Sequence, residues 1–362
     1  MPDTIPEAGH LYFWSDSEPG CTRLARLLKQ AGLRPRRLGN AVAAAFRADD
    51  LGPLWPLLQA ALSEEELIAT RALLKADDQP PGFADFVNVL SLKRLLAAVE
   101  RRWIAGVLAA DALASHFQPI VCAVDPRRVF AHEALLRATD LDGSTVSAGR
   151  LFAAAREAGL TAQLDRAARH CALRSARRVG LDTALFINFV PSAVADPRSS
   201  LEGTVRLALE AGFDPHRIVF EVVESEDYGD LPGLQGVLME YRRAGFRIAL
   251  DDLGAGYASL NRLTQLRPDI VKLDMALVRG IDADSYKAEL AHRLVELAHS
   301  LGCEIVAEGV ETAGEMAVVR ALDVEYVQGF YIARPMPAPL PQPAVEPALE
   351  PAGRPPAVGA VA

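Results

Sequence analysis

The sequence predicts an α/β fold, a (β/α)8-type TIM barrel that follows a small α+β N-terminal domain. Between Phe117 and Met336, short apolar runs that suit buried strands alternate with amphipathic helices, which is the pattern of such barrels. Several of these runs end in a polar residue, usually an acid. Residues 9–99 lack this regular alternation, so we expect them to form a separate unit.

The first part of the chain, residues 1–90, is expected to be a regulatory or interaction domain. Its strand candidates are residues 11–14 and 41–46, and helices are expected at 21–31, 54–62 and 64–75. The break Pro80-Pro81-Gly82 separates them from a last stretch at 83–99. Residues 91–113 have apolar residues at helical spacing and predict a connecting helix. This helix could carry a signal or a dimer contact, and an ordinary packed helix is the alternative.

The barrel is expected to occupy residues 114–337. Its strands are expected at residues 117–121, 129–136, 184–189, 218–223, 247–251, 270–273, 304–307 and 326–331. Helices are expected between most of them, at residues 148–157, 163–179, 199–211, 234–243, 260–266, 287–301 and 315–322. The stretch 338–362 is rich in Pro and Ala and lacks an aromatic residue, which predicts a disordered tail.

Composition limits the partners that the protein can have. Half of the 362 residues are apolar, and the net charge of −9 argues against a nucleic-acid polymer as partner, although a local basic pocket for a phosphate ligand is compatible with it. The four cysteines lack metal-ligand spacing, which favours a reducing cytoplasm. No secretory leader and no apolar run of membrane-spanning length is evident.

Two adjacent acids, Asp251 and Asp252, close the apolar run 246–250 and precede a glycine-rich loop. If the run is a buried strand, both acids lie at its carboxyl end, where barrels place their chemistry. Neighbouring carboxylates repel each other when both are ionised, and a bound cation relieves this repulsion. The pair therefore predicts a divalent-metal site, with a helix N-cap or an Asx-turn as the alternative.

Other strands end in the same way, and most of their polar groups offer oxygen. The residues in question are Glu133, Asn188, Glu221, Asp251, Lys272 and Glu308. Because strand ends converge on one face of a barrel, these groups are expected to lie together. A set of oxygen ligands without His or Cys suits magnesium or manganese better than zinc. The alternative at each single position is a solvated loop residue or a helix cap.

Seven motifs in order over residues 115–337 resemble the EAL family of cyclic di-GMP phosphodiesterases. They are Glu133-Ala134-Leu135-Leu136-Arg137, Asn188, Glu221-Val222-Val223-Glu224, Asp251-Asp252-Leu253-Gly254-Ala255-Gly256-Tyr257, Lys272-Leu273-Asp274, Ala307-Glu308-Gly309-Val310-Glu311-Thr312 and Gln328-Gly329-Phe330. Each motif alone is weak, but their order over one barrel length is specific. The resemblance implies a modified barrel with one antiparallel strand, and it does not extend to residues before about Leu108.

The resemblance implies a site with two Mg²⁺ or Mn²⁺ ions. One ion would be held by Glu133, Asn188, Glu221 and Asp251. Asp252 would help to hold the second ion, and Asp251 would bridge the two. Lys272 would contact the attacking water, while Glu308 would be required near the second ion and Gln328 would support the site.

The resemblance also implies positions that bind the substrate. Arg137 matches an arginine that pairs with a ligand phosphate, for which a guanidinium is well shaped. Gln118, Leu135 and Pro335 match positions along the ligand groove. Glu224 matches a residue that supports the loop after Asp252.

The implied activity is the metal-dependent hydrolysis of cyclic di-GMP, a bacterial second messenger, to linear pGpG. The resemblance further implies a homodimer through the barrel, and the N-terminal domain could bind a protein partner. In the loop at 253–258, Leu253, Ala255 and Ala258 replace the Phe, Thr and Ser usual in the family, which predicts altered regulation. Two alternatives stay open: a receptor that binds cyclic di-GMP without cleaving it, and an interaction protein with the barrel as scaffold.

Overall fold

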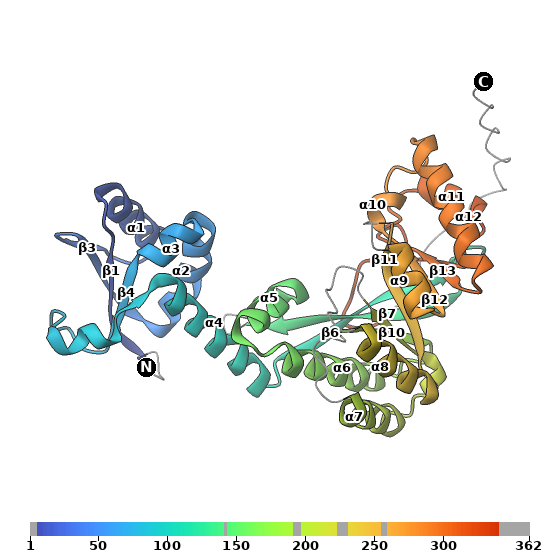
Figure 1. Ribbon diagram of the computed structural model, residues 1–362, viewed down its shortest axis with the longest axis horizontal. Coiled ribbons are helices and arrows are strands. Elements are labelled where there is room, and N and C mark those ends of the chain that lie inside the picture. Colours follow the sequence, from blue (N-terminus) through green and yellow to red (C-terminus); the bar gives the residue numbers. More distant parts are fainter. Residues whose placement is uncertain (1–5, 141–142, 191–196, 223–230, 255–258, 340–362) are drawn as a thin grey trace. The chain divides into compact units, whose positions relative to one another are not determined.

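The computed structural model describes residues 6–140, 143–190, 197–222, 231–254 and 259–339 (Figure 1). The chain forms two compact units. The first comprises Met1–Gly106 and Ala153–Leu160, and the second comprises Val107–Phe152 and Thr161–Ala362. No helix in the described ranges combines the length and the apolar character needed to cross a membrane.

The first unit is an α+β structure, as predicted, and it is built on an antiparallel five-stranded sheet. Its strand order is β2 (Arg36–Leu38), β3 (Ala41–Arg47), β1 (Ala8–Trp14), β4 (Arg71–Lys75) and β5 (Leu90–Ser91). Its helices are α1 (Glu18–Gln30), α2 (Ala48–Ala61), α3 (Glu64–Ala69) and α4 (Leu92–Ala109), with a 3-10 helix at Phe83–Asn88. Leu11 and Phe13 of β1 share a buried cluster with Leu24 of α1, Leu54 of α2 and Leu96 of α4. Alternation along β1 thus sends one side of the sheet into a helix-covered core.

The predicted helix at residues 64–75 is wrong in its second half. Ser63 begins α3 with a capping box, because its Oγ accepts from the N–H of Glu66 and the Glu66 carboxylate accepts from the N–H of Ser63. The helix nevertheless ends at Ala69, and Arg71–Lys75 pairs antiparallel with β1. Pairing with a distant strand overrides the local helical spacing here.

The second unit is the predicted barrel, closed by eight strands. Their order is β6 (Leu113–Cys122), β14 (Tyr326–Val327), β13 (Glu304–Ala307), β12 (Ile270–Leu273), β11 (Arg247–Leu253), β10 (Ile218–Val222), β9 (Ala184–Phe189) and β7 (Val129–Thr139). Contact between β6 and β7 closes the ring, and β8 (Thr145–Ser147) extends the sheet beside β7. Strand β6 is antiparallel to both of its neighbours, while the other pairings within the ring of eight strands are parallel. The one antiparallel strand expected in the barrel is thus confirmed. The last strand is shorter than predicted, because the chain turns at Gly329, whose carbonyl accepts from Ile332 and Ala333.

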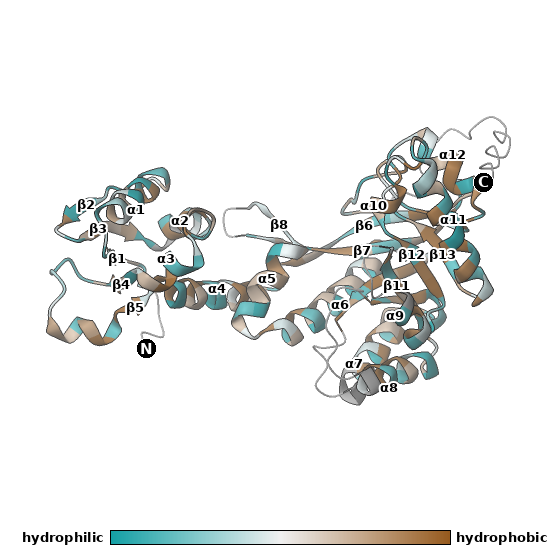
Figure 2. Ribbon diagram, turned by 45° about the horizontal axis from the view of Figure 1, so that its top comes forward, coloured by the Kyte–Doolittle hydropathy of each residue, from teal (hydrophilic) through white to brown (hydrophobic). Residues whose placement is uncertain are grey.

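Helices cover the outside of the barrel, and Figure 2 shows their polar outer faces against the apolar strands β12 and β13. They are α6 (Thr161–Arg178), α7 (Pro197–Glu210), α8 (Leu231–Arg243), α9 (Ser259–Leu266), α10 (Met275–Val278), α11 (Ser285–Ser300) and α12 (Ala313–Ala321), with a 3-10 helix at Pro215–Arg217. Helix α5 (Ala148–Ala158) begins in the second unit, and its residues from Ala153 onward belong to the first. A large apolar cluster lies between the strands and these helices. The predicted tail falls largely outside the described residues, which end at 339.

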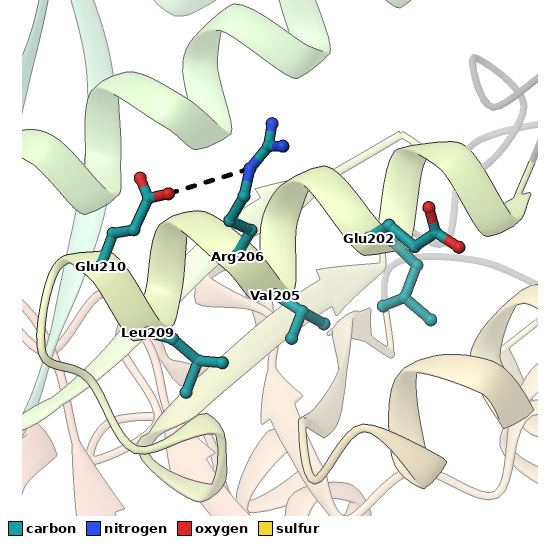
Figure 3. Close-up of a pocket in the computed structure, with 6 residues that line it drawn as sticks. Glu202, Val205, Arg206, Leu209 and Glu210 are labelled. Atoms are coloured by element: carbon teal, nitrogen blue, oxygen red, sulfur yellow. Dashed lines mark ion pairs between the residues drawn. The ribbon is translucent and has the colours of Figure 1, made fainter.

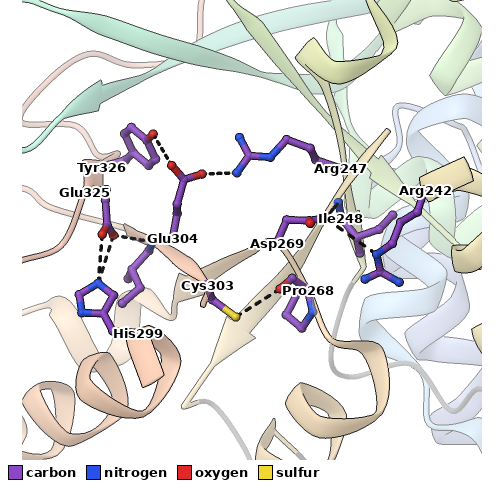
Figure 4. Close-up of polar contacts among 11 residues, drawn as sticks. Arg242, Arg247, Ile248, Pro268, Asp269, His299, Cys303, Glu304, Glu325 and Tyr326 are labelled. Carbon is purple, nitrogen blue, oxygen red and sulfur yellow. Dashed lines mark hydrogen bonds and ion pairs between the residues drawn. The ribbon is translucent and has the colours of Figure 1, made fainter. Parts of the chain in front are cut away.

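The amino ends of the later strands carry a polar network of their own (Figure 4). Glu304 at the start of β13 pairs with Arg247 of β11 and accepts from the hydroxyl of Tyr326 at 3.0 Å. His299 and Glu325 are 3.1 Å apart at the same end. Since barrel chemistry resides at the carboxyl ends of strands, we interpret this network as a stabilising one.

Candidate functional site

A layer of polar side chains lies in the barrel interior next to an apolar layer, on the side of the carboxyl ends of the parallel strands. The apolar layer contains Ile120, Ala131, Phe186, Val219, Ala249, Ile270 and Val306, one from each of seven strands. The polar residues stand two positions further along: Glu133, Asn188, Glu221, Asp251, Lys272, Glu308 and, after Tyr326, Gln328. Side chains of a strand alternate between its two faces, so a shift of two positions keeps the same face. Gln118 comes two positions before Ile120 because β6 runs in the opposite direction.

Asp251 and Asp252 share this site although they are neighbours in a strand. The pairing of β11 with β12 shifts register between Leu250 and Leu253, and Asp252 has a left-handed backbone with φ of 59°. Such a bulge redirects a side chain that alternation would point outward. Oxygens of Asp251, Asp252 and Glu308 lie within 4.8 Å of one another. An uncommon backbone conformation of this kind is typical of functional sites.

Lys272 forms the centre of the site and is 1% exposed. Its Nζ lies 2.5 Å from Glu308 Oε1, 2.8 Å from Glu221 Oε1, 3.2 Å from Asp251 Oδ1 and 3.7 Å from Glu133 Oε2. One buried cation therefore faces four carboxylates. This arrangement leaves an excess of negative charge in a place that is poor in water.

Amides orient the carboxylate of Glu133. Asn188 Nδ2 donates to Glu133 Oε1 at 3.1 Å, and Gln328 Nε2 donates to Glu133 Oε2 at 2.7 Å. Gln328 Nε2 also lies 3.1 Å from Gln118 Oε1, and Gln118 Nε2 donates to the carbonyl of Ala333. This chain of contacts connects β9, β7 and β6 with the segment after β14, and it restricts the rotation of the Glu133 side chain.

The acids of the site differ in how readily they ionise. Burial raises the pKa of Glu221 well above its usual range, and the Glu133 charge adds to this effect. Burial also raises the pKa of Glu308 to about 8, although the Lys272 charge opposes it. The pKa of Asp252 rises to about 6 through burial and the nearby Asp251 charge. For Glu133, burial would raise the pKa, but Lys272, Gln328 and Asn188 together lower it.

These residues fit a divalent cation. Both carboxylate oxygens of Glu221 and Oδ1 of Asp251 are buried, and the Lys272 ammonium lies 2.8 Å from Glu221 Oε1 and 3.2 Å from Asp251 Oδ1. Because Glu133 and Glu308 share the same ammonium, it does not balance all of these carboxylates. Buried carboxylate oxygens without donors are costly unless a charge balances them. Oxygen donors without His or Cys are those that Mg²⁺ and Mn²⁺ prefer. Among the described residues, Asp251, Asp252 and Glu308 form an acidic group whose oxygens lie close enough together to bind one metal ion.

A cavity of about 210 Å³ opens onto this layer. Its lining includes the predicted residues Gln118, Glu133, Glu308 and Gln328. It also includes residues that were not predicted as site residues: Met275, Arg279, Gly309, Glu311, Gly329 and Phe330. Glu311 and Phe330 stand inside two of the seven motifs, so the sequence held a signal for them. Arg279 follows β12 by six residues and stands in none of the seven motifs, so the structure alone places it beside the site, 2.5 Å from Glu311.

The remaining predicted groove residues do not line this cavity. Leu135 and Arg137 follow Glu133 on the same face of β7, and Arg137 donates to the carbonyl of Leu136. Pro335 precedes Met336, which pairs with Phe117 next to Gln118. Glu224 and residues 255–258 lie outside the described residues, and Leu253 is fully buried in the outer core.

A larger hollow of about 420 Å³ lies on α7 and carries none of this chemistry (Figure 3). Leu201, Val205 and Leu209 line it together with Glu202, Arg206 and Glu210. All six residues come from one helix, so the hollow is a surface feature of that helix. The candidate site is therefore the smaller cavity over the polar layer.

Comparison with known proteins agrees with this geometry. The model of the EAL domain family matches residues 101–335. NbdA of Pseudomonas aeruginosa, named a cyclic di-GMP phosphodiesterase, is 33% identical over 234 residues, which are 63% of this chain and 29% of NbdA. PdeF of Escherichia coli, with the same designation, is 30% identical over 57% of this chain and 28% of its own length. The chain thus spans less than a third of these two relatives.

Solved structures extend the comparison to the fold. A standalone EAL protein from Vibrio cholerae, in its c-di-GMP-bound form, is 31% identical with a TM-score of 0.58, and covers 64% of this chain and 95% of its own. BlrP1 from Klebsiella pneumoniae has a TM-score of 0.57 at 22% identity. It covers 91% of this chain and 96% of its own. At that identity the likeness concerns the fold alone.

Proposed function

The chain belongs to the EAL domain family, and we propose that it hydrolyses cyclic di-GMP to linear pGpG with two bound Mg²⁺ or Mn²⁺ ions. The observation that carries the proposal is the layer in which Lys272 lies within 4 Å of Glu133, Glu221, Asp251 and Glu308. A receptor that only binds the dinucleotide has no need of a buried acidic layer with oxygens left for a cation. Several relatives bear the name of this activity.

In this proposal, Glu133, Asn188, Glu221 and Asp251 would hold one ion, and Asp251 and Asp252 would help to hold the second. Bound there, the ions would supply Lewis acidity and lower the pKa of a water molecule. The buried ammonium of Lys272 stabilises negative charge that develops on the phosphate, an effect that is larger in a dry site than in water. Glu308 Oε1, 2.5 Å from that ammonium, accepts a proton when ionised. Gln328 and Asn188 keep the carboxylate of Glu133 in one orientation.

The groove provides the contacts that hold the substrate. Gln118, Leu135, Arg137 and Pro335 would line the path of the dinucleotide, and the Arg137 guanidinium would pair with a phosphate. Glu224 would support the loop after Asp252. A homodimer through the barrel, a protein partner of residues 1–90 and a cytoplasmic location stay predictions.

The direct test is an assay of the purified chain with cyclic di-GMP and either Mg²⁺ or Mn²⁺, followed by chromatography of the nucleotides. We expect one product, pGpG, formed in proportion to time. Intact substrate with both metals, together with tight binding, would identify a receptor and contradict the proposed activity.

Replacing Asp251 by asparagine is expected to lower turnover by about three orders of magnitude, since a ligand shared by both ions is worth several kcal/mol. The change keeps the shape of the side chain and removes its charge. Turnover at saturating Mn²⁺ measures the effect, and Asp125→Asn, which breaks an exposed pair with Arg127, is the matched control. Similar turnover in the two variants would exclude Asp251 from the reaction.

Calcium is expected to bind without supporting turnover. Its longer bonds and looser geometry suit a displacement between two ions poorly. The measurement is product formation in Mg²⁺ with increasing Ca²⁺, where inhibition that excess Mg²⁺ reverses is expected. Full turnover in Ca²⁺ alone would argue against a site with small, well-ordered ions.

A further inference from the structure

A buried ion pair lies outside the polar layer, in helix α6. Arg169 is 1% exposed and is among the largest fully buried side chains of the described residues. Its Nη2 lies 2.8 Å from Oδ2 of Asp165, one helical turn earlier. Removing two charges from water costs several kcal/mol per ion, and replacing such a pair by apolar residues is often neutral or stabilising. A contribution to stability alone is thus a weak explanation for this pair.

The pair connects three helices with the carboxyl end of one strand. Arg169 Nη1 donates to the hydroxyl of Thr204 in α7 at 3.0 Å and to that of Tyr241 in α8 at 2.9 Å. Its guanidinium also lies over the ring of Phe189, the last residue of β9, at 5.3 Å. The second oxygen of Asp165, Oδ1, accepts from the backbone N–H of Val190 at 3.0 Å.

These contacts involve the two residues that directly follow Asn188, whose side-chain amide lies in the candidate site. Asn188 immediately precedes Phe189 and Val190, and its Nδ2 donates to Glu133. Strand β9 ends at Phe189, so the N–H of Val190 lies beyond the ladder and finds its acceptor in Asp165. A shift of the backbone at 189–190 would therefore move the Asn188 amide relative to Glu133 and Glu221.

We propose that the Asp165–Arg169 pair positions Asn188 for cation binding, by holding the end of β9 through the N–H of Val190 and the ring of Phe189. The inference rests on the proposed function, since it takes Asn188 as a ligand. Asp165 and Arg169 act through the backbone and do not touch the ion. Partners that orient ligands commonly change metal affinity by 10- to 100-fold when they are replaced.

Two double variants separate positioning from stability. Asp165→Ala with Arg169→Met removes both charges and the acceptor of the Val190 N–H. Asp165→Asn with Arg169→Met also removes both charges but keeps an oxygen that can accept this bond. Neither variant separates the two charges of this pair, so both are expected to fold, which thermal unfolding checks. Glu304→Gln, at the amino ends of the strands, is the control (Figure 4).

The measurement is Mn²⁺ binding by calorimetry, without nucleotide, for the whole chain. We expect the Ala/Met variant to bind about tenfold more weakly and the Asn/Met variant to recover to within about threefold of the parent. Affinity equal to that of the parent in both variants overturns the proposal, as does an equal loss in both. If the Ala/Met variant fails to fold, Tyr241→Phe is used instead, with about threefold weaker binding expected. Unchanged binding then overturns the proposal.

Asn188→Ala separates a failure of the proposed function from a failure of the positioning role of Asp165 and Arg169. If the parent chain binds no Mn²⁺, the proposed function fails and the positioning role fails with it. If the parent binds Mn²⁺ and Asn188→Ala weakens this binding while the Ala/Met variant does not, only the positioning role fails. If Asn188→Ala leaves the affinity unchanged, Asn188 is no ligand, and the positioning role is overturned even where hydrolysis persists.

Discussion

Replacing Lys272 by methionine is expected to reduce the turnover of cyclic di-GMP by at least about 100-fold, even at saturating Mn²⁺. Methionine has a similar length but lacks the ammonium that faces four carboxylates. The charge that stabilises a developing negative phosphate is then absent. Turnover and substrate binding are measured separately, so that lost binding is not mistaken for lost chemistry.

The same variant carries a second expectation, which concerns stability. Without the ammonium, the buried acids repel each other, and breaking a buried pair typically costs about 3–5 kcal/mol. Without metal, the variant should therefore melt at a lower temperature than the parent. Mn²⁺ should raise the melting temperature of the variant by more than it raises that of the parent. Lys93→Met, which breaks an exposed pair with Glu64, is the control and should change stability by less than about 1 kcal/mol. Parent-like turnover in Lys272→Met would contradict the assigned role.

Replacing Gly329 by alanine is expected to destabilise the barrel by about 3 kcal/mol and to lower turnover as well. A Cβ at this position would lie 2.0 Å from the carbonyl oxygen and 2.4 Å from the nitrogen of Val310. Both are backbone atoms, so neither can rotate away. The segment must move, and with it Gln328, whose amide reaches Glu133 at 2.7 Å.

Denaturation in urea and the turnover assay test this expectation together. Gly203→Ala is the matched control, because a Cβ there meets nothing within 4 Å and alanine favours helix α7 by about 1 kcal/mol. The control should be at least as stable as the parent and equally active. A Gly329→Ala variant with parent-like stability would show that the close approach to Val310 can relax freely.

Much of the fold and of the candidate site could be predicted from the sequence. Strands β9, β12 and β13 begin and end at the predicted residues, because a short apolar run is a local signal of a buried strand. Lys272 was predicted for the same reason, since it stands near the end of β12. Glu133 was also predicted as a strand-end residue, but it lies within β7, which continues to Thr139. The spacing of two positions above the apolar layer then follows from alternation alone.

Other features depend on residues that are far apart in the chain. Arg71–Lys75 has helical spacing but becomes a strand, because β1 offers it a pairing edge. The side chain of Asp252 faces the site because a bulge and a left-handed backbone change its direction. No local sequence pattern predicts either feature. The need for glycine at 329 arises from Val310, nineteen residues away.

The sequence by itself thus determined the barrel, its order of strands and helices, and the acids at the strand ends. Only the tertiary structure decided that Lys272 contacts four of these acids, that Asp251 and Asp252 reach the same space, and that Asp165 and Arg169 hold the end of β9. The physical reason is the distance along the sequence between the residues that make each feature. Periodicity and motifs involve neighbouring residues, whereas charge balance, close backbone approach and the orientation of a ligand arise between distant segments that folding brings together.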